Sequence, residues 1–279
     1  MRSVEEIREI STRIKRDVIQ LTSSNTGHPG GALGAADIIA ELYFNRMNHD
    51  PKNPNREDRD RFVLSNGHIC AALYSAMARS GYFELDELYT FRKINSRLQG
   101  HPSRKDLPGI ETSSGPLGQG LSVANGIALA NRLKGIDARI YCLVGDGEIQ
   151  EGQIWEAVMT SAHYKLDRLA LIISWNDIQI DGNVKDVMNI EPIADKFKAF
   201  GWNTIEIDGH DLHQIRAAFD AFEQHRGSPT AIIARTVIGK GVSFMENKAI
   251  WHGKAPSAEE AKKALEEIGP SQFGEDLNC

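Results

Sequence analysis

The carboxylate of Asp146 and the amide of Asn176, thirty positions apart, are oxygen donors of the types that bind a divalent cation. Ile178, two residues after Asn176, can add a backbone carbonyl. A hard cation that prefers octahedral coordination can take these three ligands together with the oxygens of a diphosphate. Gly145 and Gly147 flank Asp146, and without a Cβ they would let the backbone approach the phosphate groups closely.

Two apolar runs are placed so that they can position these ligands. Residues 139–144 and 169–174 are typical of buried parallel strands, and residues 151–166 are typical of a helix between them. Because open α/β sheets bind ligands at the carboxyl ends of their strands, Asp146 and Asn176 are expected at one rim. The tripeptide Gly-Asp-Gly alone is more typical of a simple turn. The two strands and the shared helix favour a metal-diphosphate loop instead.

The rest of the chain alternates strand-like and helix-like segments. This alternation predicts an α/β fold in which a parallel sheet is covered by helices on both faces. We expect a single cofactor-binding domain over residues 1–279, with a surface helix and tail from about 257 to 279. The further strands are expected at 61–64, 202–207 and 229–234, and the further helices at 3–21, 35–44, 71–80, 117–133, 190–200 and 212–223. Residues 83–114 are expected to be irregular and to carry binding loops.

The composition excludes several classes of protein. The net charge of −6, a pI near 5.9 and interspersed charges argue against a nucleic-acid partner. No stretch is apolar enough for a membrane span, and the charged N-terminus does not resemble a signal peptide. Cys70, Cys142 and Cys279 lack metal-like spacing and do not suggest a disulfide framework, which favours a cytoplasmic protein.

The spacing from Gly-Asp-Gly to the asparagine is that of the thiamine diphosphate motif, and the chain resembles the transketolase family. The other segments that resemble transketolase signatures lie in the family's order, from about residue 20 to residue 256. They are His28-Pro-Gly-Gly, Leu64-Ser-Asn-Gly-His68, Gly100-His-Pro102, Ser114-Gly-Pro-Leu-Gly-Gln-Gly120 and Trp251-His-Gly-Lys-Ala-Pro256. The resemblance implies thiamine diphosphate as cofactor, with Mg²⁺ (or Ca²⁺ or Mn²⁺).

The resemblance also implies which residues bind the cofactor. Asp146, Asn176 and the Ile178 carbonyl would hold the metal, and Gly147 would face the diphosphate. Gly115 and Leu117 would contact the aminopyrimidine.

Four histidines match family residues that line the cofactor and donor-substrate channel. His101 and His252 are candidates for proton transfer or hydrogen bonding at the donor hydroxyls. His28 and His68 could stabilise a developing oxyanion or orient the donor, and His68 is also a candidate cofactor contact. The remaining histidines considered are interpreted as ordinary surface or core residues: His163, His210, His213 and His225.

Two glutamates follow the Gly-Asp-Gly tripeptide. Glu151 matches a transketolase glutamate at the subunit interface, where it would join a hydrogen-bond network that reaches a glutamate of the partner. A carboxylate favoured by a helix N-terminus is a second interpretation of Glu151, and the two are compatible. Glu148 is expected to be solvated.

Full-length transketolases resemble three fused domains, and this chain corresponds to the first. The second domain of the family supplies the glutamate that bonds the pyrimidine ring of the cofactor. The resemblance therefore implies a partner subunit with the pyrimidine-binding and C-terminal domains, in a heterotetramer that also self-associates through the cofactor domain. The expected activity is transfer of a two-carbon ketol group between sugar phosphates, as in the pentose phosphate pathway, by the assembled enzyme only.

Departures from the family pattern leave other functions open. Ser174-Trp175-Asn176 stands where many transketolases have Asp-Asp-Asn, so the donor sugar is uncertain, and Lys254 is inserted near the end. Other candidates are an α-type chain of a 2-oxoacid dehydrogenase, a deoxyxylulose phosphate synthase-like protein and a relative that acts on a modified sugar. A module that kept the fold and lost the chemistry is a non-catalytic alternative.

Overall fold

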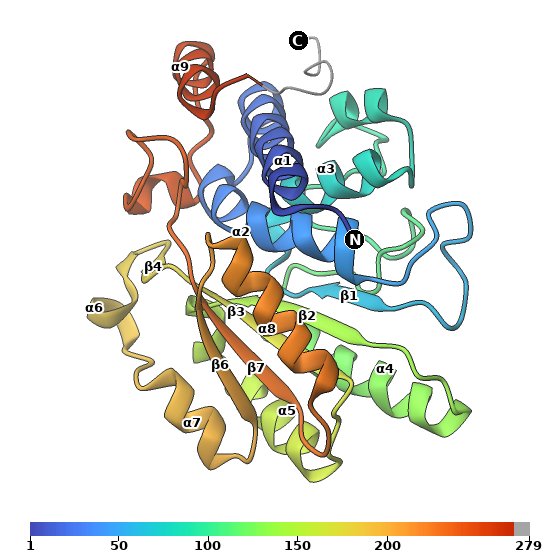
Figure 1. The fold of residues 1–279 in the computed structure, drawn as a ribbon. Coiled ribbons are helices and arrows are strands. Elements are labelled where there is room, and N and C mark those ends of the chain that lie inside the picture. The colour runs from blue at the N-terminus through green and yellow to red at the C-terminus, as the bar shows by residue number, and fades with distance from the viewer. Residues whose placement is uncertain (271–279) are drawn as a thin grey trace.

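A five-stranded parallel sheet forms the centre of the protein (Figure 1). The structure is a computed structural model and describes residues 1–270. The strand order is β1-β2-β3-β7-β6, with β1 at Arg61–Leu64, β2 at Ile140–Gly145, β3 at Leu169–Trp175, β7 at Thr230–Arg235 and β6 at Asn203–Asp208. The predicted α/β class with a parallel sheet is confirmed.

Helices cover both faces of this sheet (Figure 1). One face packs on α4 (Gly120–Lys134), α5 (Gly152–His163) and α7 (Ile193–Ala199). The other face packs on α1 (Val4–Asn25), α2 (Pro29–Glu41), α3 (Cys70–Ser80) and α8 (Leu212–Gln224), and α9 (Ala258–Ile268) joins that side against α1. Since successive residues of β2 and β3 are buried on opposite faces, these strands are apolar throughout, as predicted.

The predicted helix at 35–44 was wrong at both ends. It starts at Pro29, and after Glu41 the chain continues as a π turn, Leu42–Arg46. The early glycines of α2 lower helix propensity, which obscured the start, but close packing requires them. A Cβ on Gly30 would lie 2.6 Å from both Ile238 and the Trp251 carbonyl.

The predicted helix at 117–133 starts at Gly120 because the residues before it form a loop, in which Gly118 has a φ of +81°. Short elements that the sequence did not predict follow β3. They are a hairpin of β4 (Ile178–Gln179) and β5 (Gly182–Asn183), and the short helix α6 (Val184–Met188). The predicted helix after residue 257 is α9, and residues 271–279 of the predicted tail lie outside the described residues.

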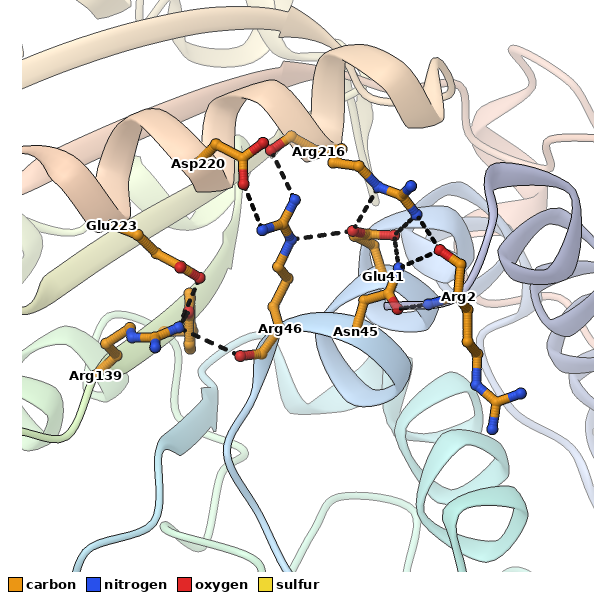
Figure 2. Close-up of polar contacts among 9 residues, drawn as sticks. Arg2, Glu41, Asn45, Arg46, Arg139, Arg216, Asp220 and Glu223 are labelled. Carbon is orange, nitrogen blue, oxygen red and sulfur yellow. Dashed lines mark hydrogen bonds and ion pairs between the residues drawn. The ribbon is translucent and has the colours of Figure 1, made fainter.

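Buried charges fix the C-terminal end of α2 against α8 (Figure 2). The carboxylate of Glu41 is fully buried and accepts hydrogen bonds from Arg46 Nε at 3.0 Å and Arg216 Nε at 3.1 Å. Arg46 also pairs with Asp220 of α8 at 2.5 Å. Because buried charges are tolerated only when they are paired, this network sets the position of α2, whose other end carries His28.

None of the helices in residues 1–270 combines the length and apolar character that crossing a membrane requires.

Candidate active site

A cavity of about 370 Å³ lies at the carboxyl ends of β1, β2 and β3. All the site residues predicted from the sequence line it, although they come from segments far apart in the chain. They are His28, His68, His101, Gly115, Leu117, Asp146, Gly147, Glu151, Asn176, Ile178 and His252. The structure therefore brings the complete predicted set together around one space.

Asp146 lies at the base of this cavity and is only 2% exposed. Its carboxylate accepts hydrogen bonds from the N–H groups of Gly147 at 2.8 Å, Asn176 at 2.9 Å and Asp177 at 2.6 Å. These bonds tie the loop after β2 to the loop after β3. Burial nevertheless raises the pKa of Asp146 to about 6. A cation bound beside the carboxylate would oppose this effect of burial.

The groups around Asp146 fit a metal-diphosphate better than a free metal ion. Within residues 1–270, no three His, Cys, Asp or Glu side chains are grouped to hold a metal, so oxygens from a ligand would have to complete the coordination. The backbone at Gly147 lies close to Gln179, another residue of the cavity wall, since a Cβ added to Gly147 would be 3.2 Å from Gln179. Among the described residues, His28 Nδ1 and Asn66 Oδ1 are buried without a hydrogen-bond partner, and both residues line the cavity. Unpaired buried polar atoms are uncommon and suit a polar ligand.

Glu148 is buried, so the expectation that it is solvated was wrong. It is 2% exposed, and its carboxylate accepts hydrogen bonds from the Ser65 hydroxyl, from Gly118 N–H at 2.8 Å and from Gly145 N–H at 3.2 Å. Burial raises its pKa. The single turn of 3₁₀ helix at Gly147–Gln150 directs this side chain inward, where it joins three loops that form the cavity wall. Sequence reasoning missed the burial of Glu148 because two of its three partners, Ser65 and Gly118, come from distant segments.

Glu151 is exposed at the mouth of the cavity and is the N-cap residue of α5. Its side chain makes no capping hydrogen bond. Its Cβ would be 2.8 Å from a Cβ placed on Gly118, so it packs directly against the loop that carries Gly115 and Leu117. The interpretation of Glu151 as a helix N-terminal carboxylate agrees with this position, and its predicted interface role stays a prediction.

Four histidine rings form one wall of the cavity. The centroid of the His28 ring lies 5.3 Å from that of His68, 6.3 Å from that of His101 and 5.9 Å from that of His252. His68 and His252 are 5.0 Å apart. The four rings are thus close enough to act on one small substrate. His163, His210, His213 and His225 do not line this cavity.

These rings share an environment that favours the neutral imidazole. Burial is the main cause, and it lowers the pKa of His28 to about 4 and that of His68 to about 3, with further lowering by His252. Burial also lowers the pKa of His101 and His252. Neutral rings can donate one hydrogen bond and accept another, which suits binding of sugar hydroxyls.

The lowered pKa of His68 predicts how the stability depends on pH. Below pH 6.5 the unfolded chain takes up a proton at His68 that the folded protein does not, so stability is full above pH 6.5 and falls as the pH decreases towards 3. Replacing His68 by Gln should reduce the slope of unfolding free energy against pH by up to about 1.4 kcal/mol per unit in this window. Urea unfolding between pH 4.5 and 8 measures this slope. His213→Gln, at an exposed position of α8, is the control, and equal slopes for His68→Gln and wild type would contradict the lowered pKa of His68.

Comparison with known proteins identifies the family. The family model described as "Transketolase, thiamine diphosphate binding domain" matches residues 2–273. The chain therefore belongs to the transketolase family, in which it represents the thiamine diphosphate-binding domain.

Individual relatives agree with this assignment. The chain is 39% identical over 270 residues to a subunit of the apulose-4-phosphate transketolase of Actinobacillus succinogenes, covering 95% of this chain and 97% of the relative. It is 41% identical over 242 residues to a subunit of the 6-deoxy-6-sulfo-D-fructose transketolase of a Clostridium species, covering 87% and 88%. The crystal structure of Campylobacter jejuni transketolase is 38% identical, with a TM-score of 0.88, and covers 96% of this chain. The match takes in only 43% of that longer chain. In extent, the present chain corresponds to the N-terminal subunit of a split transketolase.

Proposed function

We propose that this chain is the cofactor-binding subunit of a two-chain transketolase that moves a two-carbon ketol group from a ketose phosphate to an aldose phosphate. The observation that carries the proposal is that one cavity is lined both by Asp146, Asn176 and Ile178 and by four histidines with lowered pKa values. The first group of residues suits a metal-diphosphate, and the histidines suit a polyhydroxylated substrate. Membership of the transketolase family supports thiamine diphosphate as the cofactor.

In this proposal each part of the cavity has a defined task. Asp146, Asn176 and the Ile178 carbonyl hold Mg²⁺, and Gly147 faces the diphosphate. Gly115 and Leu117 contact the pyrimidine ring. Thiamine diphosphate, when bound, supplies the carbon nucleophile and the electron sink.

The histidines act on the substrate. His101 and His252 bind the donor hydroxyls and transfer protons, while His28 and His68 orient the donor carbonyl and stabilise negative charge on its oxygen. Their lowered pKa values keep these rings neutral at pH 7, so each can both donate and accept.

A partner subunit completes the site. Exposed residues at the cavity mouth include Glu151, Leu117 (37% exposed) and Ile180 (68% exposed). A carboxylate among apolar side chains suits a surface that is covered on assembly. The partner would supply the pyrimidine-binding glutamate and the C-terminal domain, with two copies of each chain in a heterotetramer.

A modified sugar is the second candidate substrate. Two relatives are named for apulose-4-phosphate and for 6-deoxy-6-sulfo-D-fructose. Trp175, in place of an acidic residue common in transketolases, also separates this chain from the usual pattern. The reaction type stays the same, and only the donor or acceptor changes.

Reconstitution with the partner tests the proposal. We expect ketol transfer from xylulose 5-phosphate, or from a modified ketose, only when the chain is co-purified with its partner and supplied with thiamine diphosphate and Mg²⁺. The chain alone should be inactive, because in this proposal the partner supplies the pyrimidine-binding glutamate. Measurement of aldose product release with each component omitted in turn decides this. Full activity of the isolated chain would contradict the partner requirement, and turnover of pyruvate without any ketose would contradict the transketolase assignment.

A further inference from the structure

The loop between β3 and β4 is held in an unusual conformation at Asp177, between the two loop ligands proposed for the metal. Asp177 has a φ of +62°, in the left-handed region that non-glycine residues rarely adopt. Its N–H donates to Asp146 Oδ2 at 2.6 Å, and its carbonyl accepts from Val184 N–H at 2.8 Å. Asn176 and Ile178, on either side of it, both line the cavity. The conformation of Asp177 therefore sets where both of its neighbours present their oxygens.

The side chain of Asp177 is fixed by two donors outside the cavity. Trp175 Nε1 donates to Oδ1 at 2.6 Å, and Arg235 Nη1 donates to Oδ2 at 2.8 Å. The Arg235 guanidinium also lies over the face of the Trp175 ring, and the two residues are paired in the register of β3 and β7. Trp175, Asp177 and Arg235 form a closed triangle of contacts, which we call the loop clamp. None of the three lines the cavity.

We infer that the loop clamp consists of positioning residues that set the affinity of the metal site by holding the loop at 176–178 in its left-handed turn. This inference rests on the proposed function, and it explains a departure from the family pattern. Trp175 stands where many transketolases carry an acidic residue, and here the indole supplies both a hydrogen bond to Asp177 and a surface for Arg235.

A role limited to global stability does not fit the exposure of the clamp. The side chains of Arg235 and Asp177 are 48% and 41% exposed, and exposed ion pairs contribute little to folding. By contrast, residues that orient metal ligands without touching the metal typically change metal affinity by 10–100-fold. Loss of the clamp should therefore appear in metal binding and leave thermal unfolding nearly unchanged.

Substitution of Arg235 tests the inference in the complex of the full chain with its partner. For Arg235→Met, the Mn²⁺ concentration that half-saturates the site at saturating thiamine diphosphate should rise about tenfold, as read from loss of the free-ion EPR signal. The kcat at saturating metal should stay within about twofold, and the metal-free Tm should not change. Asp177→Asn should weaken Mn²⁺ binding in the same direction. The double variant should be no weaker than the more affected single variant, because both changes act on the same Arg235–Asp177 ion pair.

Arg168→Met is the matched control. Arg168 pairs with exposed Asp137 at 2.6 Å beside the opposite end of β3, so the substitution removes the same charge from a similar ion pair far from the cavity. Its Mn²⁺ affinity should equal that of wild type. Provided that wild type binds Mn²⁺, two results would overturn the inference. One is unchanged Mn²⁺ affinity in both clamp variants, and the other is a lower Tm without weaker metal binding. If wild type itself takes up no Mn²⁺ with thiamine diphosphate, the metal site of the proposed function fails, and the inference fails with it.

Discussion

Asp146→Asn should abolish Mg²⁺-dependent binding of thiamine diphosphate, with a loss of affinity of more than about 100-fold. Asp146 is the carboxylate ligand of the proposed metal site, since the other two groups are the amide of Asn176 and the carbonyl of Ile178. A neutral amide in its place leaves the metal and the diphosphate without a counter-charge from this loop. Isothermal titration with thiamine diphosphate, with and without Mg²⁺, measures the effect.

The same substitution should not destabilise the metal-free fold at pH 7.5. The pKa of Asp146 is raised from 3.8 to about 6, so the folded protein binds a proton at this carboxyl more tightly than the unfolded chain does. The contribution of this proton to stability is complete below pH 3.8 and is lost as the pH rises through 6. Above that pH the buried charge opposes folding by about 3 kcal/mol, which the amide removes. Asn keeps an acceptor for the N–H groups of Asn176 and Asp177 and loses that for Gly147.

Weaker cofactor binding without a loss of stability in the metal-free protein would distinguish loss of a metal ligand from loss of the fold. Asp195→Asn, which removes an exposed charge on α7, should bind cofactor as wild type does. Retention of tight, Mg²⁺-dependent binding by Asp146→Asn would show that the metal is held elsewhere.

Glu148→Ala should have the second large effect, a loss of about 3 kcal/mol of stability together with much weaker cofactor binding. The carboxylate is the buried acceptor for Ser65, Gly118 and Gly145, and without it these buried donors lose their protein partner. The expected fall in Tm is roughly 6–12 °C for a chain of this size. Cofactor binding weakens because Gly118 ends the loop that carries Gly115 and Leu117.

Glu148→Gln is the informative comparison. It keeps an acceptor oxygen for Gly118 and removes a charge whose pKa burial has raised, so we expect much of the stability to return. Glu156→Ala, at an exposed position of α5, should leave the Tm unchanged. Differential scanning calorimetry of the three variants gives the result, and equal Tm values for Glu148→Ala and wild type would mean that this carboxylate does not organise the loops.

The sequence prediction was accurate for elements that are set by local signals and less accurate for those that depend on distant residues. The strand at 61–64 was predicted with its observed bounds, and the other sheet strands within one residue at each end, because a run of apolar residues buried on both faces is a local signal. Helix starts were less accurate where a loop binds the site or where glycines are kept for packing, as at Pro29 and Gly120.

The residues that line the site could be predicted from the sequence, whereas the residues that hold them in place could not. Loop histidines and the Gly-Asp-Gly tripeptide carry their signal in a few adjacent residues. Ser65 lies 83 positions from Glu148, whose carboxylate it bonds, and Arg235 lies 58 positions from Asp177, with which it pairs. No local pattern encodes such pairings, so the sequence indicated which groups meet the ligand but not which residues hold them in place.

Helix α2 differs strongly between its two ends. Its C-terminal end is anchored by Glu41 and Arg46 in the network of Figure 2, whereas its N-terminal turn carries His28 and packs through Gly30 against Ile238. Because the helix is anchored at one end and packed without spare volume at the other, it offers little freedom for redesign. In the neighbouring turn Ala249–His252, by contrast, Ile250 is 64% exposed, so a substitution of its side chain disturbs less packing than one in α2.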